Sequence, residues 1–326
     1  MMAGLRVMRG YGMNRRKFVG SIAMAAAGSV ALKRAARAEE KDQWHLGPLH
    51  KGKAKEARVG ATPFPLSVML WTVFRDLPFE ERLKKVAEAG YTNVELVGEY
   101  EHWADAEYES ANRARKELGI KFDATAGLKN GVANAMVRDA FLQELQDAFM
   151  PMDRLEIPAM IVLSGNVVEG QTRAEQHAAA IETLKQAAKL VEGKKIAGEP
   201  VRLLLECIDP EENAHYYLTS AAEAIEIVRA VNHPQVQFLY DLFHEQIAEG
   251  NLIEKIDKHA DVIGLIHVAD VPGRHEPGTG EINYANVYRA LKKAKYGHKV
   301  AMEFLPKGDA VEALRKAREE VASAVV

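Results

Sequence analysis

The feature that most constrains the fold of this chain is an eightfold alternation of short β-type runs with segments of helical period. The β-type runs cover residues 66–71, 92–97, 120–125, 159–164, 201–206, 236–241, 262–268 and 299–304. Seven helix-period segments lie between or after them, at residues 78–89, 106–118, 173–192, 220–231, 252–259, 284–294 and 311–321. Strands that alternate with helices predict parallel βαβ units.

The length of the alternating region favours a closed barrel. We place the domain at residues 63–326, which fits the roughly 250 residues typical of a (β/α)8 barrel. An open, doubly wound sheet is the alternative, and it usually begins with a glycine-rich phosphate turn after its first strand. The corresponding turn here, residues 71–74, reads Trp-Thr-Val-Phe and has no glycine. The sequence therefore predicts an α/β fold, a single-domain TIM barrel.

The first 38 residues differ in composition from the rest. They hold eight Lys or Arg residues and no Asp or Glu. Arg15 and Arg16 directly precede an Ala- and Gly-rich apolar stretch at residues 18–32, and residues 36–38, Ala-Arg-Ala, supply a small-x-small cleavage pattern. The segment resembles a twin-arginine export signal. A basic, disordered tail is the alternative interpretation.

This interpretation predicts three regions: a cleavable signal at 1–38, a linker or N-terminal arm at 39–62, and the barrel at 63–326. The twin-arginine translocase carries folded proteins, so we expect folding in the cytoplasm before export to the periplasm. A chain whose one cysteine, Cys207, excludes an internal disulfide fits that route. Met13 is an alternative start to Met1.

Charge and hydropathy exclude several classes of protein. Residues 39–326 hold 35 basic and 46 acidic side chains, a net charge of −11, which is a poor match to nucleic acid. No apolar run reaches the roughly 18–20 residues that span a bilayer, so stable membrane insertion is not expected. A single cysteine also excludes a cysteine-based zinc site.

Four consecutive predicted strands end in a residue of metal-ligand type. These residues are Glu206, Asp241, His267 and Glu303. Active sites of TIM barrels lie at the carboxyl ends of the strands. Three carboxylates that converge there without a cation would repel each other and be driven toward protonation. A divalent cation removes this conflict, and oxygen ligands with one imidazole suit Mg²⁺ or Mn²⁺, with Co²⁺ also compatible. For any single residue, a salt bridge or a helix cap is the alternative.

Other polar residues lie close to these strand ends in the sequence. Arg274, in a Gly- and Pro-rich loop at 269–283, offers a planar fork for a carboxylate or a hydroxyl-rich substrate. His244 follows Asp241 by three residues and would face the same pocket if a helix begins there. Lys307, after the last strand, either binds a substrate carboxylate or phosphate or is simply solvated. Trp71 is either an apolar wall of the pocket or part of the core.

Three sequence segments resemble one known group. They are residues 241–244 (Asp-Leu-Phe-His), the loop 269–283, and residues 303–309 (Glu-Phe-Leu-Pro-Lys-Gly-Asp). They resemble the hydroxypyruvate isomerase group of the xylose isomerase-like (sugar phosphate isomerase/epimerase) TIM-barrel superfamily, which also contains ketose 3-epimerases. Residues 90–95, Gly-Tyr-Thr-Asn-Val-Glu, resemble the second-strand pattern of this superfamily. The similarity runs from about residue 66 to residue 320 and is densest over 201–309.

The resemblance implies roles for particular residues. Glu206, Asp241, His267 and Glu303 match the metal-ligand positions, and Glu206 and Glu303 match the paired catalytic glutamates. His244, Arg274 and Glu212 match substrate-contacting positions. The chain departs from the group at Cys207 and Asp209, where Pro and Asn are usual. His267 is a further departure, because many members have glutamine there and the epimerases have histidine.

The implied activity is that of a divalent-metal-dependent isomerase. It would move a proton between adjacent carbons of a small keto acid or ketose through an enediolate, with the two glutamates as base and acid. A ketose 3-epimerase on the same site and a non-catalytic, exported carbohydrate-binding protein are alternatives. A metal-dependent phosphodiesterase related to endonuclease IV is a further one, but the net charge of −11 and a single set of four ligands speak against it. Related barrels often form dimers or tetramers, so a homo-oligomer stays open.

Overall fold

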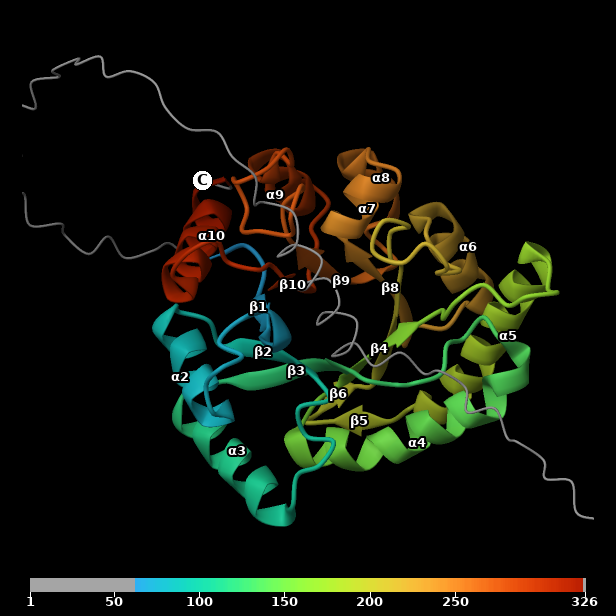
Figure 1. Cartoon of the computed structure of the whole chain (residues 1–326), viewed down its shortest axis with the longest axis horizontal. Coiled ribbons are helices and arrows are strands. Elements are labelled where there is room, and N and C mark those ends of the chain that lie inside the picture. Colours follow the sequence, from blue (N-terminus) through green and yellow to red (C-terminus); the bar gives the residue numbers. More distant parts are fainter. Residues whose placement is uncertain (1–61, 325–326) are drawn as a thin grey trace, which may run out of the picture. The chain divides into compact units, whose positions relative to one another are not determined.

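Eight parallel strands close into a barrel with helices around the outside (Figure 1). This computed structural model describes residues 62–324. The predicted signal, the alternative start at Met13 and the predicted arm up to residue 61 lie outside the described residues. The strands run in the order β1-β10-β9-β8-β7-β4-β3-β2 around the barrel. The predicted TIM barrel is confirmed.

The eight barrel strands correspond to the eight predicted β-type runs. They are β1 (Leu66–Met69), β2 (Asn93–Val97), β3 (Lys121–Ala126), β4 (Ala159–Leu163), β7 (Arg202–Glu206), β8 (Val236–Asp241), β9 (Ile263–Val268) and β10 (Lys299–Met302). β1 ends two residues before the predicted boundary because the chain turns into a short 3-10 helix, η1 (Leu70–Thr72). The hydroxyl of Thr72 donates to the carbonyl of Met69 over 2.8 Å and closes this turn.

Nine α-helices are present in the described part of the chain. They are α2 (Phe79–Glu88), α3 (Asp105–Glu117), α4 (Arg138–Leu155), α5 (Arg173–Val191), α6 (Ala221–Val231), α7 (Leu242–Ala248), α8 (Leu252–His259), α9 (Tyr284–Lys293) and α10 (Ala310–Ala324). Local sequence sets several of their ends. Thr172 and Glu175 form a capping box at the start of α5, and Gly90, with φ 88°, follows α2.

Two of these helices are absent from the sequence-based set. The sequence patterns predict no helix at α4, and they predict a helix after Asp241, at α7, only if the chain turns there. Four residues of α4 are buried at helical spacing: Phe141, Leu145, Met152 and Leu155. Pro151 lies inside α4 without ending it. Packing of this apolar face outweighs the hydrogen bond that a proline removes. The structure also adds the 3-10 helix η2 (Ala135–Val137) and a two-stranded hairpin, β5 (Lys195–Ile196) with β6 (Glu199–Pro200).

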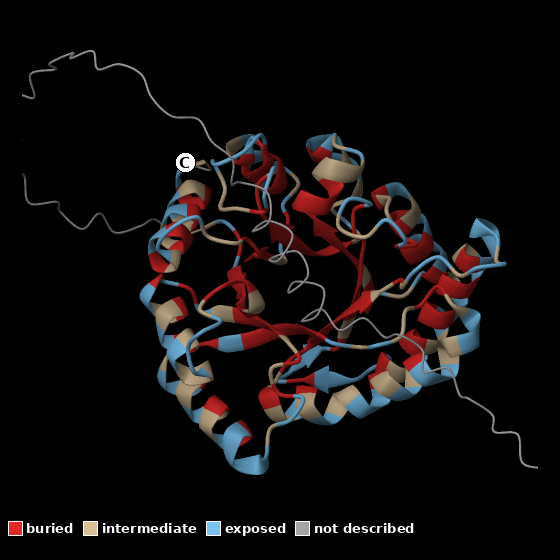
Figure 2. Cartoon of the chain, viewed as in Figure 1, coloured by how far each residue is buried: buried red, intermediate tan, exposed pale blue. Residues whose placement is uncertain are grey.

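The core has an inner and an outer part. The inner part fills the barrel with residues from its strands: Met69, Ala124, Ala126, Ala159, Ile161, Leu204, Leu239, Leu265 and Ala301. A larger cluster packs the remaining strand residues against the helices. Figure 2 shows the buried strands at the centre and exposed residues on the outer faces of the helices. Because the inner cluster plugs the barrel, a ligand would reach the interior only at its ends.

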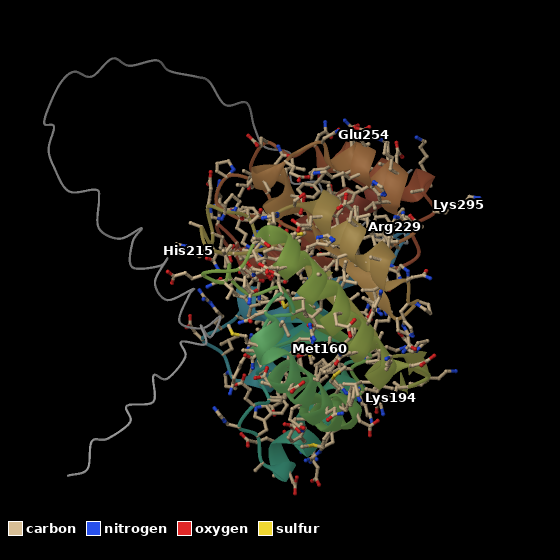
Figure 3. All side chains as sticks on the ribbon, turned by 90° about the vertical axis from the view of Figure 1, so that its right-hand side faces the viewer. Met160, Lys194, His215, Arg229, Glu254 and Lys295 are labelled. Atoms are coloured by element: carbon tan, nitrogen blue, oxygen red, sulfur yellow. The ribbon has the colours of Figure 1, made fainter. Side chains whose placement is uncertain are left out.

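The loops divide between two ends of the barrel. Figure 3 shows His215, in the loop after β7, at one end, and Lys194 and Lys295, which precede strands, at the other. The first end carries the carboxyl termini of the strands, where the chemistry of such barrels is placed. None of the helices in residues 62–324 combines the length and apolarity that crossing a membrane requires.

Candidate active site

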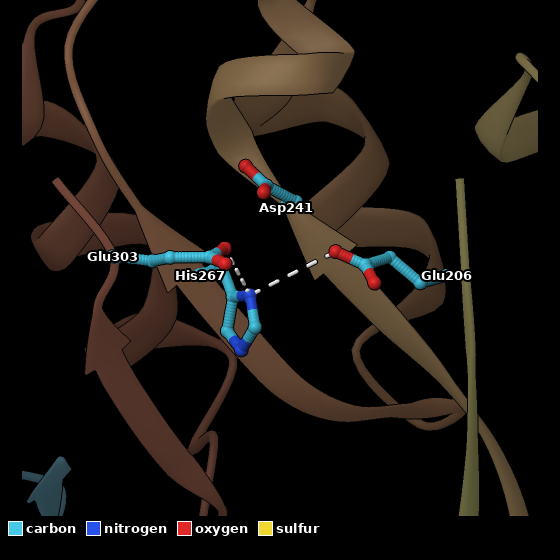
Figure 4. Close-up of side chains that lie close together, drawn as sticks. All are labelled: Glu206, Asp241, His267 and Glu303. Carbon is cyan, nitrogen blue, oxygen red and sulfur yellow. Dashed lines mark ion pairs between the residues drawn. The ribbon is translucent and has the colours of Figure 1, made fainter. Parts of the chain in front are cut away.

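Four side chains converge at the carboxyl end of the barrel (Figure 4). Glu206 and Asp241 are the last residues of β7 and β8, His267 lies near the end of β9, and Glu303 directly follows β10. One ligand atom from each lies within 4.8 Å of the others, and all four residues are buried. The parallel pairing brings them together, since Asp241 and His267 are register partners in β8 and β9.

His267 is held between two acidic groups on opposite sides of its ring. Its Nε2 lies 2.8 Å from Oε2 of Glu95, on β2. Its Nδ1 lies 2.6 Å from Oε2 of Glu303 and 3.9 Å from Oε1 of Glu206. Burial alone would lower the pKa of His267, but Glu303 and Glu95 outweigh it and raise this pKa well above the usual value.

The two oxygens of Asp241 have different partners. Oδ1 caps α7 by accepting from the backbone N–H groups of Phe243 (2.8 Å) and His244 (3.3 Å). Oδ2 faces the site, 3.3 Å from a guanidinium nitrogen of Arg274. Asp241 is therefore a helix cap, which was the alternative to a metal ligand for any single residue. The cap fixes the carboxylate in place, and Oδ2 still faces the site.

The guanidinium of Arg274 lies among three carboxylates of the site. It lies 2.6 Å from Glu212, 3.3 Å from Asp241 and 2.9 Å from Oε2 of Glu303. Burial would lower the pKa of Arg274, but Glu303, Glu212 and Asp241 outweigh it and raise this pKa further. A buried, permanently charged fork among three carboxylates offers directional donors to an oxygen-rich ligand.

The loop that carries Arg274 is organised by Asp270. Oδ1 of Asp270 accepts from the backbone N–H groups of Val271 and Ile282, and Oδ2 accepts from that of Gly280 over 2.9 Å. A Cβ at Gly280 would meet the carbonyl oxygen of Val271 at 2.1 Å, so only glycine fits there. These contacts place Arg274, which itself has a left-handed φ of 57°, over the site.

His244 belongs to a second group with Asp209 and Glu212. Its Nδ1 lies 2.6 Å from Oδ2 of Asp209, and its Nε2 lies 3.3 Å from Arg274. Burial lowers the pKa of His244, but Asp241 and Asp209 outweigh burial and Arg274 and raise it to about 9. Oδ1 of Asp209 also accepts from the backbone N–H of Glu212 over 2.9 Å, so Asp209 orients both neighbours.

Trp71 lies at the edge of the site as well as of the core. Its indole N–H donates to Oε1 of Glu303 over 2.9 Å, and its ring centre is 5.6 Å from the guanidinium carbon of Arg274. The residue is partly buried and packs against the inner apolar cluster. Trp71 therefore both borders the site and packs against the core. Its hydrogen bond to Glu303 does not follow from the sequence.

The structure brings seven of the eight predicted site residues together and leaves Lys307 apart. The seven are Glu206, Glu212, Asp241, His244, His267, Arg274 and Glu303. Lys307 is exposed, and its backbone N–H donates to Glu276 over 3.1 Å. Within residues 62–324, its side chain forms no ion pair with any of the seven. The solvated interpretation of Lys307 fits this placement better than substrate binding does.

The donor set fits a divalent cation. Its members are three carboxylates and one imidazole, whose ligand atoms lie within 4.8 Å of one another. Mg²⁺, Mn²⁺ and Co²⁺ accept ligands of these kinds. Glu206, Asp241, His267 and Glu303 would hold the ion. Their burial also fits, because a cation compensates negative charge that water does not reach.

Comparison with known proteins assigns the family. A family model described as "Xylose isomerase-like TIM barrel" matches residues 83–322. This chain belongs to that family. It is 30% identical over 252 residues to the 2-oxo-tetronate isomerase of Pectobacterium atrosepticum, covering 74% of this chain and 92% of that protein. It is also 30% identical over 263 residues to a putative hydroxypyruvate isomerase of Danio rerio, covering 75% and 92%.

A solved structure extends the likeness to three dimensions. A protein from Brucella melitensis titled "AP endonuclease, family 2" has 27% identity and a TM-score of 0.68, covering 78% of this chain and 97% of that one. The family expected from sequence and an enzyme of the isomerase class are both confirmed by these relatives.

Two residues of the site escaped sequence reasoning as site residues. Glu95 was noted only within a second-strand pattern, and Asp209 only as a departure from the group. Glu95 could have been recognised as an acidic residue in the middle of a predicted strand, and the structure shows it to be buried. Asp209 gave no such signal, because its partner His244 lies 35 residues further along the chain.

Proposed function

We propose that this protein is a divalent-metal-dependent isomerase of a small keto acid or ketose, similar to hydroxypyruvate isomerase, that moves a proton between adjacent carbons. The convergence of four ligand-type side chains within 4.8 Å is the observation that carries this proposal. The relatives named 2-oxo-tetronate isomerase and putative hydroxypyruvate isomerase support a keto acid as the substrate class.

The groups present supply what such a reaction requires. Bound among the four ligands, a divalent cation would polarise the substrate carbonyl and stabilise charge that develops on its oxygen. Glu206 and Glu303 are then the carboxylates that exchange a proton with the substrate. One accepts the proton of the hydroxyl-bearing carbon beside the carbonyl, and the other donates a proton to the former carbonyl carbon. The hydroxyl proton passes to the former carbonyl oxygen, so that the carbonyl and the hydroxyl group exchange places. Trp71 holds Glu303 in position through its indole N–H.

The second group would orient the substrate. Arg274, His244 and Glu212 lie beside the four ligand residues and present a guanidinium, an imidazole and a carboxylate. Arg274 suits a carboxylate or vicinal hydroxyl groups, since its donors form a planar fork. The aromatic rings of Trp71 and Phe243, at 5.6 and 5.1 Å from its guanidinium carbon, restrict its movement.

Proton exchange with solvent tests the proposal. The metal-free protein is loaded with Mn²⁺, Mg²⁺ or Co²⁺ and incubated in D₂O with hydroxypyruvate, 2-oxo-tetronate and a panel of ketoses. We expect metal-dependent incorporation of deuterium beside the carbonyl, detected by NMR, and isomer formation from at least one substrate. Absence of exchange across the panel, with cleavage of abasic DNA, would instead identify a phosphodiesterase. Tight sugar binding without exchange would identify a binding protein.

A ketose 3-epimerase is the second candidate, and His267 favours it. The epimerases carry histidine at this position, whereas many hydroxypyruvate isomerases carry glutamine. The same exchange experiment separates the two activities, because an epimerase returns the proton to the opposite face of one carbon. A ketose whose configuration inverts without movement of its carbonyl would identify the epimerase.

We also propose export through the twin-arginine translocase to the periplasm. Arg15 and Arg16 before the apolar stretch, and the Ala-Arg-Ala pattern at 36–38, support this proposal. Replacing both arginines by lysine should retain the full-length precursor in the cytoplasm, as measured by cell fractionation and immunoblotting. Replacement of Arg34 and Arg37 by lysine is the control and should leave export unchanged, because both follow Met1 and Met13 and lie outside the arginine pair. Equal export of both variants would contradict the proposal.

A further inference from the structure

We propose that Glu95 is a positioning residue for the metal site: it holds the imidazole of His267 so that Nδ1 faces the bound cation. This inference rests on the proposed metal-dependent function. It assigns a role to a residue outside the four-ligand set, on a strand that contributes none of those ligands. Glu95 is fully buried and lies 172 residues from His267 in sequence.

The geometry separates the two nitrogens of His267. In Figure 4 one ring nitrogen is turned toward Glu303 and Glu206, and the other is turned away from them. The nitrogen toward the cluster is Nδ1, at 2.6 Å from Glu303 and 3.9 Å from Glu206. The nitrogen turned away is Nε2, at 2.8 Å from Oε2 of Glu95. Glu95 and the ligand carboxylates therefore approach the ring from opposite edges.

The chemistry of imidazole gives this arrangement its meaning. A neutral imidazole carries one N–H and one lone pair, and only the nitrogen with the lone pair binds a metal. A carboxylate accepts a hydrogen bond and cannot donate one, so Glu95 keeps a proton on Nε2. Without a cation, Glu303 keeps a second proton on Nδ1 in the same way. A bound cation would displace that second proton and take the Nδ1 lone pair, while Nε2 stays protonated against Glu95. A carboxylate behind a metal-binding histidine also makes the ring a stronger ligand.

The surroundings of Glu95 argue against a role in stability alone. Within the described residues, its second oxygen, Oε1, has no hydrogen-bond partner. Burial and the charge of Glu95 raise the pKa of the neighbouring Asp123 to about 8, against the opposing effect of Lys299. A buried carboxylate so placed costs folding free energy. Glu95 orders His267 as a metal ligand, which an apolar side chain at this position would not do.

Metal affinity is the measurement that tests this role. The variants are Glu95→Gln, which keeps an acceptor oxygen without the charge, and Glu95→Leu, which has no acceptor. Mn²⁺ affinity is measured by competition with a fluorescent chelator and by electron paramagnetic resonance of free Mn²⁺. We expect Glu95→Leu to bind Mn²⁺ about 10–100-fold more weakly than the unaltered protein, and Glu95→Gln to fall between them.

Two controls separate positioning from folding. Asp123→Asn removes another buried acid from the barrel interior, and we expect its Mn²⁺ affinity to stay within about threefold of the unaltered protein. In a His267→Ala background, Glu95→Leu should weaken Mn²⁺ binding no further, because the ring through which Glu95 acts is gone. A structural role would instead lower the unfolding temperature without metal and reduce affinity similarly in both backgrounds.

The possible results distinguish the two proposals. If the unaltered protein binds no divalent cation, the proposed metal-dependent function fails, and the role of Glu95 fails with it. If the unaltered protein binds Mn²⁺ and both Glu95 variants bind it as tightly, the positioning role is wrong while the metal site stands. An equal loss of affinity in the presence and absence of His267 would also overturn the positioning role.

Discussion

Glu206 and Glu303 are the residues whose loss should affect chemistry most directly. Each is a candidate ligand and a candidate proton-transfer group. Replacement of either by glutamine removes the acid–base function, so we expect the exchange rate to fall by about 10²–10⁴-fold. Deuterium incorporation at saturating Mn²⁺ measures this effect. Glu281→Gln, an exposed change in the loop that carries Arg274, is the control and should retain activity.

Trp71 should affect catalysis through Glu303. Its indole N–H donates to Oε1 of that residue over 2.9 Å. Trp71→Phe removes this donor and keeps an aromatic ring. Hydrogen bonds to charged groups contribute about 1.5–3 kcal/mol, so we expect kcat to fall by about tenfold or more. Trp103→Phe is the matched control, since Trp103 packs against Phe79 and lacks the contact with Glu303. Equal kcat values for both variants would contradict this role.

At the scale of single elements, α7 joins the site to the helical layer. Its start is capped by Asp241, and His244 in its first turn contacts Arg274. Glu245, the next residue, is fully buried, and Lys255 lies 3.5 Å from it. Burial raises the pKa of Glu245 to about 7, against the opposing effect of Lys255. The short helix α7 therefore carries a carboxylate that ionises only near pH 7.

This raised pKa predicts the pH dependence of stability. In the unfolded chain Glu245 ionises near pH 4.3, whereas in the folded protein it ionises near pH 7. The folded state thus holds the extra proton between these values, so its stability falls as the pH rises across this window. Glu245→Gln should remove up to roughly 4 kcal/mol of this decline.

Urea unfolding at pH 5 and pH 8 checks this prediction. The variant should gain stability relative to the unaltered protein at pH 8 more than at pH 5. Glu249→Gln is an informative control: burial would raise the pKa of Glu249, but Lys255 and Ser220 outweigh burial and lower this pKa below its usual value. Its substitution should therefore cost more stability at pH 8 than at low pH. The same pH slope for Glu245→Gln and the unaltered protein would contradict the raised pKa.

At the scale of the whole molecule, a cation that binds four strands at once should stabilise the barrel. Binding to the folded state alone contributes about 2.7 kcal/mol at a metal concentration 100 times the Kd. For a domain of this size that corresponds to a rise in Tm of roughly 5–10 °C. Thermal unfolding with Mn²⁺ and with EDTA measures the difference.

Asp241→Asn is the matched variant for this experiment. Asparagine retains the cap on α7 but removes the carboxylate from the site, so the fold should persist. We expect its metal-dependent rise in Tm to be largely lost. If the variant gains as much from Mn²⁺ as the unaltered protein does, the ion binds elsewhere.

Much of the fold follows from local patterns in the sequence. All eight barrel strands and seven of the helices match segments whose periodicity is visible without coordinates. The convergence of Glu206, Asp241, His267 and Glu303 could also be predicted, because parallel strands of a barrel end at the same side. α4 does not follow from local pattern in the same way, because it contains Pro151 and depends on burial of Phe141 and Leu145 against the rest of the domain.

The contacts that give the site its chemistry were decided by tertiary structure. Glu95 meets His267 across 172 residues of sequence, and Arg274 meets Glu212 across 62. A sequence pattern reports backbone preference and the end of the barrel at which a side chain lies. Closure of the barrel, strand register and the fold of the 269–283 loop determine which side chains touch, and these depend on packing throughout the domain.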